Sequence, residues 1–320
     1  MKTLWTGYSL TVILATGLVA FFYWMNTPLL VTTVKFSPLP TFLTMSDNPQ
    51  VTSLDIWQPK VLGTNTQTSA ISITATSAIS YDLTSNKFLF LKNPNQRLPM
   101  ASLTKIMTAI VALEHPLPSD KYLVKGRDLV GEDSMGLVDG ETLSLEELLY
   151  GLILHSGNDA AETLADNFPA GRDGFISAMN LKAQTLGLTN THFTNPTGLE
   201  GDGTQYTTAQ DLLVMTQYAL SHFPEFVKIV GTFDYIIPQT STHQEYDLEN
   251  ETNLLTSYPG VEGVKTGYTP EAGLCLVTYL NYQNHKIIAV LLGSDDRRGE
   301  MKEMLDFSLK TQGIIPPRHL

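Results

Sequence analysis

The stretch from Arg97 to Pro116, RLPMASLTKIMTAIVALEHP, most constrains how this chain can fold. Its apolar residues fill it as they would fill a buried helix, yet Ser102 and Lys105 stand at its start. Three residues are about one helical turn, so both side chains project from the same face. Burial disfavours the charged ammonium and lowers the pKa of a lysine, which then becomes able to take a proton from a hydroxyl group. The pattern predicts a buried helix, Ser102–Glu114, that begins beside such a base.

The flanking segments alternate between strand and helix patterns. Two β-rich runs flank a turn between Ser77 and Asn93, which predicts a hairpin. Further amphipathic helices are expected to begin at Ser144, Asp159, Gly171 and Thr207. Ser144 with Glu147 has the spacing of a capping box.

After Pro259 the chain returns to strand patterns in GVEGVKTGY, GLCLVTYL and HKIIAVLLG, and GEMKEMLDFSLKTQG predicts a last helix. A hairpin, then helices, then strands and a final helix predict one mixed α/β domain, with an antiparallel sheet and a helical cluster. We place this domain at residues 70–313, followed by a tail at 314–320. The sequence contains no internal repeat.

The N-terminal segment is apolar. No charged residue occurs from Leu4 to Met25, a length close to the ~20 residues that span a bilayer as a helix. Lys2 precedes the segment and the next basic residue is Lys35, a bias that places the N-terminus in the cytoplasm. Residues 1–25 are therefore expected to form an uncleaved transmembrane anchor. A cleaved signal peptide is the alternative, but its best cleavage site, LVA, falls inside the apolar run.

Residues 26–69 are rich in proline, threonine and serine and keep no helical period. They are expected to form a tether that holds the domain away from a membrane. Part of this segment could instead pack on the domain as an edge strand. Whether residues 1–25 are an uncleaved anchor or a cleaved signal peptide, the rest of the chain is expected outside the cytoplasm.

Composition excludes several functional classes. The formal net charge of −12 argues against a nucleic-acid or anionic-lipid surface, because both need a basic footprint. The single cysteine, Cys275, cannot form an internal disulfide, and its apolar run LCLVTYL indicates a buried thiol. The seven histidines show no H-x-x-x-H spacing, so neither a metal nor a cofactor is expected.

Two further short motifs come after Ser102 and Lys105. Ser156-Gly157-Asn158 lies at a junction between two predicted helices, and Lys265-Thr266-Gly267 lies on a predicted, glycine-flanked strand. An S-x-x-K motif alone is weak, because it arises by chance in many proteins. S-x-x-K, an S-D-N-like element and K-T-G in this order form the shared signature of penicillin-binding proteins and class A β-lactamases.

The chain from about Ser77 to Phe307 resembles the low-molecular-weight penicillin-binding proteins that are serine-type D-alanyl-D-alanine carboxypeptidases, peptidase family S11. The resemblance extends to five blocks in family order: ASLTKIMTA, LLYGLILHSGNDAAETLA, THFTNPTGL, TTAQDLL and GVKTGYTPEAGLCLV. It implies the transpeptidase-like fold of penicillin-binding proteins and β-lactamases. It also implies removal of the terminal D-Ala from peptidoglycan pentapeptides through an acyl-enzyme.

The resemblance assigns a catalytic role to four residues. Ser102 would be the acylated nucleophile, and Lys105 would be the base that activates it. Ser156 would relay a proton during acylation or deacylation. Asn158 would hold the substrate amide and the lysine.

Substrate recognition is implied for the third motif. Lys265 and Thr266 would meet the terminal carboxylate of the substrate, which needs a cation and a hydroxyl donor on a strand beside the peptide. Gly267 would let that strand approach the substrate closely. The backbone N–H groups of Ser102 and Tyr268 would form an oxyanion hole.

The expected partners are peptidoglycan stem peptides, β-lactam antibiotics as covalent inhibitors and, through the N-terminal helix, the bacterial cytoplasmic membrane. The sequence departs from many relatives at Tyr268, where they carry histidine. Some relatives have a further arginine near the last strand, and the spacing here leaves Arg297 and Arg298 open. Relatives often add a β-rich second domain and a C-terminal anchor, which the N-terminal segment is expected to replace.

Four functions other than carboxypeptidase remain as alternatives. A D,D-endopeptidase uses the same serine chemistry. A β-lactamase usually has Asp where this chain has Gly157, and Glu200 is a weak candidate for its deacylating glutamate. A histidine-based hydrolase could use His155 beside Ser156, but the chain has no G-x-S-x-G motif. The intact motifs argue against a non-catalytic peptidoglycan-binding relative.

Overall fold

The computed structural model describes residues 57–59, 71–252 and 254–319, all within one unit, Asp55–Leu320. The predicted anchor at residues 1–25, and nearly all of the tether at 26–69, lie outside the described residues. Within the described ranges, no helix has both the length and the apolar character needed to cross a membrane.

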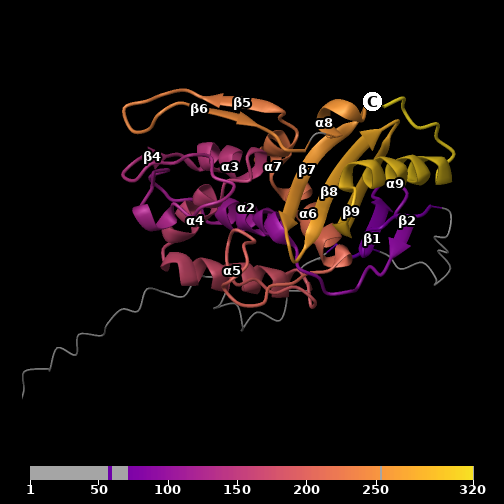
Figure 1. The fold of residues 1–320 in the computed structure, drawn as a ribbon, viewed down its shortest axis with the longest axis horizontal. Helices are drawn as coiled ribbons and strands as arrows, with labels where there is room; N and C mark the ends of the chain where they lie inside the picture. The colour runs from indigo at the N-terminus through magenta and orange to yellow at the C-terminus, as the bar shows by residue number, and fades with distance from the viewer. Residues whose placement is uncertain (1–56, 60–70, 253, 320) are drawn as a thin grey trace, which may run out of the picture. The chain divides into compact units, whose positions relative to one another are not determined.

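A five-stranded antiparallel sheet forms one part of the unit, in the order β2-β1-β9-β8-β7 (Figure 1). Its strands are β1 (Ser77–Asp82), β2 (Lys87–Lys92), β7 (Val261–Thr269), β8 (Gly273–Tyr282) and β9 (His285–Ser294). The predicted N-terminal hairpin and the three late strands are therefore confirmed. Because β1 pairs with β9, the two ends of the domain meet in one sheet.

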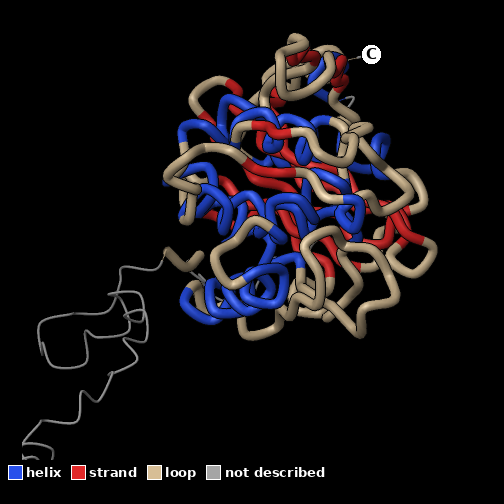
Figure 2. Tube along the Cα trace, turned by 90° about the vertical axis from the view of Figure 1, so that its left-hand side faces the viewer, coloured by secondary structure: helices blue, strands red, loops and turns tan. Residues whose placement is uncertain are grey.

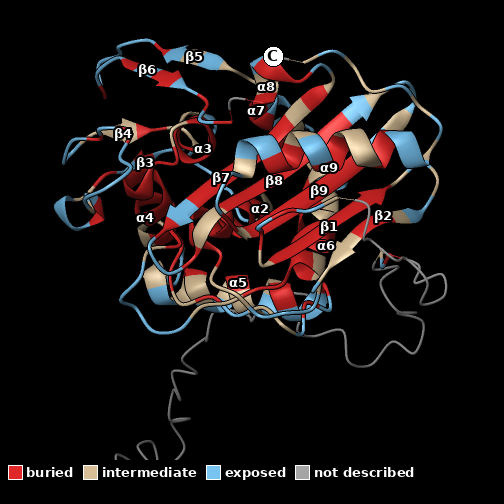
Figure 3. Cartoon of the chain, turned by 45° about the vertical axis from the view of Figure 1, so that its right-hand side comes forward, coloured by how far each residue is buried: buried red, intermediate tan, exposed pale blue. Residues whose placement is uncertain are grey.

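Both faces of the sheet are covered. Ile287, Ala289 and Leu291 of β9 belong to one apolar cluster, together with Met301 and Met304 of α9 (Arg297–Thr311). The alternate β9 residues belong to a second cluster that includes α2 and α6, because successive side chains of a strand point to opposite faces. The central strands consequently appear as continuous apolar runs, and their residues are almost all buried (Figure 3).

Helices gather beside the sheet (Figures 1 and 2). They are α2 (Lys105–Glu114), α3 (Leu145–Leu154), α4 (Asn158–Asp166), α5 (Gly171–Thr185), α6 (Ala209–His222), α7 (Pro224–Val230) and α8 (Leu254–Ser257). The short 3₁₀ turns are η3 (Ala101–Thr104) and η4 (Gly126–Asp128), and the small hairpins are β3 (Tyr122–Leu123) with β4 (Thr142–Leu143) and β5 (Asp234–Ile237) with β6 (Tyr246–Glu249).

The predicted helices are present, with local differences. The helix expected from Ser102 starts as the 3₁₀ turn η3 and becomes α-helical at Lys105. The capping box of Ser144 and Glu147 forms at the start of α3. Helix α7 and the β5–β6 hairpin had no prediction, because four-residue strands and a seven-residue helix give little periodic signal.

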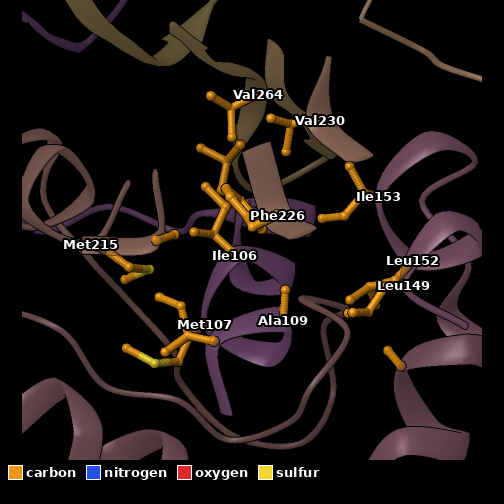
Figure 4. Close-up of a cluster of buried hydrophobic side chains, with 14 of the residues drawn as sticks. Ile106, Met107, Ala109, Leu149, Leu152, Ile153, Met215, Phe226, Val230 and Val264 are labelled. Atoms are coloured by element: carbon orange, nitrogen blue, oxygen red, sulfur yellow. The ribbon is translucent and has the colours of Figure 1, made fainter. Parts of the chain in front are cut away.

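Helix α2 is surrounded by other elements, as Figure 4 shows. Ile106, Met107 and Ala109 lie among apolar side chains from α3, α6, α7 and β7. Eight of its ten residues, from Lys105 to Ala112, are buried. This central position explains why Lys105 is buried: it begins a helix that has no solvent-facing side over its first two turns.

Candidate active site

Ser102 and Lys105 meet at the start of α2. Ser102 lies in η3, and Lys105 Nζ lies 2.9 Å from Ser102 Oγ. The lysine side chain is 0% exposed, and its amine also bonds Asn158 Oδ1 at 2.6 Å and the carbonyl oxygen of Thr197 at 2.8 Å. All three hydrogen-bonding directions of the amine are therefore occupied, one of them by the serine hydroxyl.

The surroundings favour the neutral form of Lys105. Burial lowers its pKa well below the usual range, and the nearby ammonium group of Lys265 lowers the pKa further. Three carboxylates, those of Asp133, Glu251 and Asp159, act in the opposite direction. A neutral amine at hydrogen-bond distance from a hydroxyl group can act as its general base.

Asn158 joins this pair to a nearby loop. It is the first residue of α4, and its Nδ2 donates to the carbonyl oxygen of Glu132 at 3.0 Å. Its backbone N–H donates to the carbonyl oxygen of Asp133 at 2.7 Å. The amide oxygen is thereby oriented toward Lys105, since the amide nitrogen is already engaged.

The next residue, Asp159, fastens the same loop. Its carboxylate accepts hydrogen bonds from Ser134 Oγ at 2.6 Å and from the backbone N–H groups of Met135, Gly136 and Leu137 at 2.9–3.0 Å. A buried carboxylate with several backbone donors is a strong anchor, because each bond is charge-assisted. Sequence reasoning had missed Asp159, although it adjoins Asn158.

Ser156 is held in an unusual backbone conformation. Its φ is +57°, in the left-handed region that non-glycine residues seldom adopt. The side chain is 1% exposed, and Oγ has no hydrogen-bond partner among the residues that the structure describes. A buried hydroxyl group without a partner is costly, and such groups and strained backbones cluster at functional sites.

Lys265 lies on β7 and is 1% exposed. Its Nζ finds no hydrogen-bond partner in the described part of the chain. Burial is the main cause that lowers the pKa of this lysine to about 8, with the carboxylate of Glu251 opposing it and the guanidinium of Arg297 adding to it. The result is a cation whose hydrogen-bonding capacity is unused, as an anion-binding group requires.

Close packing joins β7 to η3. A Cβ atom at Gly267 would lie 3.1 Å from the backbone nitrogen of Ser102 and 3.2 Å from the carbonyl oxygen of Met100. Gly198, with φ of +93°, approaches the carbonyl of Ala101 from another segment, and a Cβ atom there would overlap it. Gly267 therefore permits the close approach of the third motif to Ser102, and Gly198 permits the close approach of the segment after Thr197 to the same turn.

The remaining predicted residues lie on the same strand. Thr266 is buried, and its hydroxyl group donates to Glu251 Oε2 at 3.0 Å. The side chain of Tyr268 is 58% exposed. Of the two arginines that the sequence left open, half-buried Arg297 donates from Nη1 to the carbonyl oxygen of Gly267 at 3.0 Å, whereas Arg298 is exposed.

The structure therefore gathers Ser102, Lys105 and Asn158 through hydrogen bonds and brings β7 against the turn that holds Ser102. Sequence reasoning had missed Glu251, Asp133 and the carbonyl group of Thr197; no local pattern marks an acidic residue or a carbonyl that becomes a neighbour only through folding. Cys275 is buried in β8, as expected, and burial raises the pKa of its thiol to about 11.

Other candidates do not join the site. Glu200 is exposed and accepts a hydrogen bond from the backbone of Glu271. Among the described residues, no group of three or more histidine, cysteine, aspartate or glutamate side chains is arranged to hold a metal ion.

Known proteins are similar to this chain in sequence. The chain is 37% identical over 263 residues to D-alanyl-D-alanine carboxypeptidase DacF of Bacillus subtilis, covering 78% of this chain and 66% of the relative. It is 33% identical over 268 residues to a D-alanyl-D-alanine endopeptidase of Escherichia coli, covering 78% and 82%. The chain thus spans about two thirds of the length of the carboxypeptidase relatives that it matches, from 61% to 66% among three of them.

Solved structures of related enzymes also resemble this chain in fold. The DD-transpeptidase of Streptomyces K15 superposes with a TM-score of 0.70 at 31% identity, covering 75% of this chain and 98% of that one. The carboxypeptidase DacD of Francisella tularensis superposes with a TM-score of 0.69 at 26% identity, covering 79% and 72%. The mixed α/β fold with its antiparallel sheet is therefore the fold of these peptidases, as predicted.

The family model described as D-alanyl-D-alanine carboxypeptidase, Peptidase S11, matches residues 64–296, which is more than half of the chain. The chain belongs to peptidase family S11, the D-alanyl-D-alanine carboxypeptidases.

Proposed function

We propose that the protein is a serine D-alanyl-D-alanine carboxypeptidase that removes the terminal D-Ala from peptidoglycan pentapeptides. One observation carries the proposal: the amine of a fully buried lysine, Lys105, lies 2.9 Å from the hydroxyl group of Ser102. Membership of family S11 supports the same activity.

Acylation uses Lys105 as the base. The neutral amine takes the proton of Ser102 as Oγ bonds to the carbonyl carbon of the penultimate D-Ala. The backbone N–H groups of Ser102 and Tyr268 receive the negative charge that develops on the carbonyl oxygen. When the C–N bond breaks, the terminal D-Ala leaves with a proton that the Lys105 ammonium supplies, directly or through Ser156.

Deacylation completes the cycle. A water molecule attacks the ester, gives its proton to the base, and releases the shortened peptide as Ser102 Oγ regains a proton. The unpartnered hydroxyl group of Ser156 is suited to pass protons at both stages, since it has no competing partner among the described residues. Asn158 holds Lys105 and the substrate amide.

Lys265 and Thr266 are proposed to bind the carboxylate of the terminal D-Ala. Lys265 offers an ammonium group with no hydrogen-bond partner in the described ranges. Arg297, through the carbonyl of Gly267, fixes the strand that presents it. β-Lactam antibiotics carry a comparable carboxylate and a strained amide, and we propose that they acylate Ser102.

The test is incubation of the purified protein with a muropeptide pentapeptide, followed by mass analysis. The expected product is the tetrapeptide plus free D-Ala. Ser102→Ala should yield no product and no covalent labelling by a fluorescent penicillin, while its thermal unfolding stays close to that of the wild type. Labelling of the mutant would exclude Ser102 as the nucleophile, and rapid turnover of the penicillin would indicate a β-lactamase.

A D,D-endopeptidase is the second candidate, because two relatives, from Escherichia coli and Pseudomonas aeruginosa, carry that name. Both reactions cleave the bond at the carbonyl group of the same D-Ala, and they differ in the amine that leaves. A cross-linked muropeptide dimer distinguishes them: cleavage of the dimer into monomers at a rate similar to pentapeptide trimming would favour the endopeptidase.

We also propose that the domain acts on the extracytoplasmic face of the cytoplasmic membrane, anchored by residues 1–25. The uncharged run from Leu4 to Met25 supports this location. The protein should resist high-salt extraction from membranes, and mass spectrometry should find Lys2 to Met25 in the mature chain. A soluble form that begins near Phe21 would instead establish cleavage.

A further inference from the structure

A carboxylate lies beside the cations of the proposed carboxylate-binding site. Glu251 comes shortly after β6 in the chain, and its backbone N–H donates to the carbonyl oxygen of Leu154 at 3.1 Å. Its neighbours Asn250 and Thr252 are buried, and the backbone N–H of Thr252 donates to Asn250 Oδ1 at 2.9 Å. The backbone around Glu251 is therefore fixed, although its own side chain reaches solvent.

The carboxylate contacts the third motif directly. Glu251 Oε2 accepts the hydroxyl proton of Thr266 at 3.0 Å. A threonine hydroxyl group has one proton, so it can serve one strong acceptor at a time. A substrate carboxylate that uses Thr266 must therefore take the place of Glu251.

Glu251 also balances the charges of the site. The charged groups that act on Lys105 are Lys265 and the carboxylates of Asp133, Glu251 and Asp159. Those that act on Lys265 are Glu251, Arg297 and Asp133. Glu251 raises the pKa of Lys105, Lys265 and Arg297 alike. It is thus near enough to all three cations to repel a second carboxylate that approaches them.

We propose that Glu251 is a specificity-determining residue, which holds the Thr266 hydroxyl group in the free enzyme and competes with the C-terminal carboxylate of the substrate. This inference rests on the proposed carboxypeptidase function and on the role of Thr266 within it. The consequence is a weaker preference for a free C-terminal carboxylate than Lys265 and Thr266 alone would give. Substrates whose terminal carboxylate is blocked are therefore better tolerated.

Removing the charge of Glu251 should change two measurable quantities, the preference for a free-acid peptide and the pH profile of kcat/KM. Glu251→Gln keeps an oxygen that can accept from Thr266 but no longer repels an anion. The preference for a free-acid peptide over its C-terminal amide should increase by about two- to five-fold, the range expected for an exposed charge. The pH profile should also shift to lower pH on both limbs, since Glu251 raises the pKa of both lysines.

The experiment measures kcat/KM for both peptides against pH in the wild type, Glu251→Gln and Glu251→Ala, with the two peptides compared below pH 8 so that Lys265 is charged. Glu249→Gln is the matched control, because Glu249 is an exposed carboxylate at the end of β6 without a side-chain bond to β7 among the described residues. A further pair, Thr266→Val with and without Glu251→Ala, which removes the acceptor as well as the charge, tests whether the effect passes through the hydroxyl group. We expect the gain in acid preference to shrink in the Thr266→Val background.

The outcomes separate this inference from the proposed function. A wild type that does not process the free-acid peptide would contradict the carboxypeptidase itself. A wild type that is active, with folded Glu251 variants matching Glu249→Gln in acid preference and pH profile, would overturn the role of Glu251. An equal gain with and without Thr266 would exclude competition for the hydroxyl group.

Discussion

The site has two sides, a helical wall that contains Lys105 of α2 and a strand wall that contains Lys265 of β7. The two walls differ in how the hydrogen-bonding groups of their lysines are satisfied. On the helical wall, the Lys105 amine contacts Ser102, Asn158 and the Thr197 carbonyl, so each of its directions is used. On the strand wall, the equally buried amine of Lys265 has no hydrogen-bond partner among the described residues. The two lysines share burial and differ in their partners.

The difference separates reaction from recognition. A base must be oriented before the substrate arrives, so its hydrogen bonds are supplied by the protein. A carboxylate-binding cation gains most when the substrate supplies its missing bonds, because those bonds then contribute to affinity. The helical wall is expected to control the rate of acylation, and the strand wall the choice of substrate.

The largest effect is expected from Lys105. Lys105→Ala should lower the rate of acylation by penicillin by about 10²- to 10⁴-fold, since Ser102 then lacks its general base. The loss should be equal for free-acid and amidated peptides, because Lys105 acts on the hydroxyl group and not on the C-terminus. Labelling kinetics and peptide hydrolysis measure both.

A control separates lost chemistry from lost packing. Lys105→Met retains most of the buried volume, so it should fold like the wild type and be as slow as Lys105→Ala. Lys121→Ala, at an exposed lysine, should label normally. Near-normal acylation by folded Lys105→Met would show that another group is the base.

Lys265 should show the opposite pattern. Lys265→Ala should reduce kcat/KM for the free-acid peptide by about 10- to 150-fold, the equivalent of about 1.5–3 kcal/mol for a charge-assisted contact. The loss for the amidated peptide should be much smaller. The two peptides and two proteins form a double-mutant cycle in which general damage cancels. Equal losses on both peptides would show that Lys265 acts in the reaction itself and does not recognise the substrate carboxylate.

The pH dependence of kcat/KM that arises from Lys265 should be a smaller effect. The pKa of Lys265 is lowered to about 8, so its ammonium is present below pH 8 and is lost as the pH rises above it. For the free-acid peptide, kcat/KM should fall above pH 8, by at most about tenfold per pH unit. The amidated peptide should lack this alkaline limb. The same limb on both peptides would place its origin elsewhere than at carboxylate binding.

Local patterns were sufficient for most elements of the fold. The alternation and apolar runs of β1, β2 and β7 to β9 predicted the strands, and the Ser144 capping box predicted the start of α3. The order of strands in the sheet could not be predicted in this way, because pairing of β1 with β9 joins residues about 200 positions apart. Short elements such as β5 and β6 were missed for lack of periodic signal.

By itself, the sequence determined the residue types of the reaction and their local geometry: the three-residue spacing of Ser102 and Lys105 places them together on any helical turn. It also placed Lys265, Thr266 and Gly267 on one strand, which the flanking glycines and the neighbouring apolar runs indicate.

Only the tertiary structure decided which distant groups meet them. Asn158 and the Thr197 carbonyl reach Lys105 from 53 and 92 positions away, and Arg297 reaches the carbonyl oxygen of Gly267 from 30 positions away. Glu251 became a partner of Thr266 in the same way. The physical reason is that helical spacing is fixed by the backbone of one segment, whereas burial, charge balance and competition for a proton depend on how separate segments pack.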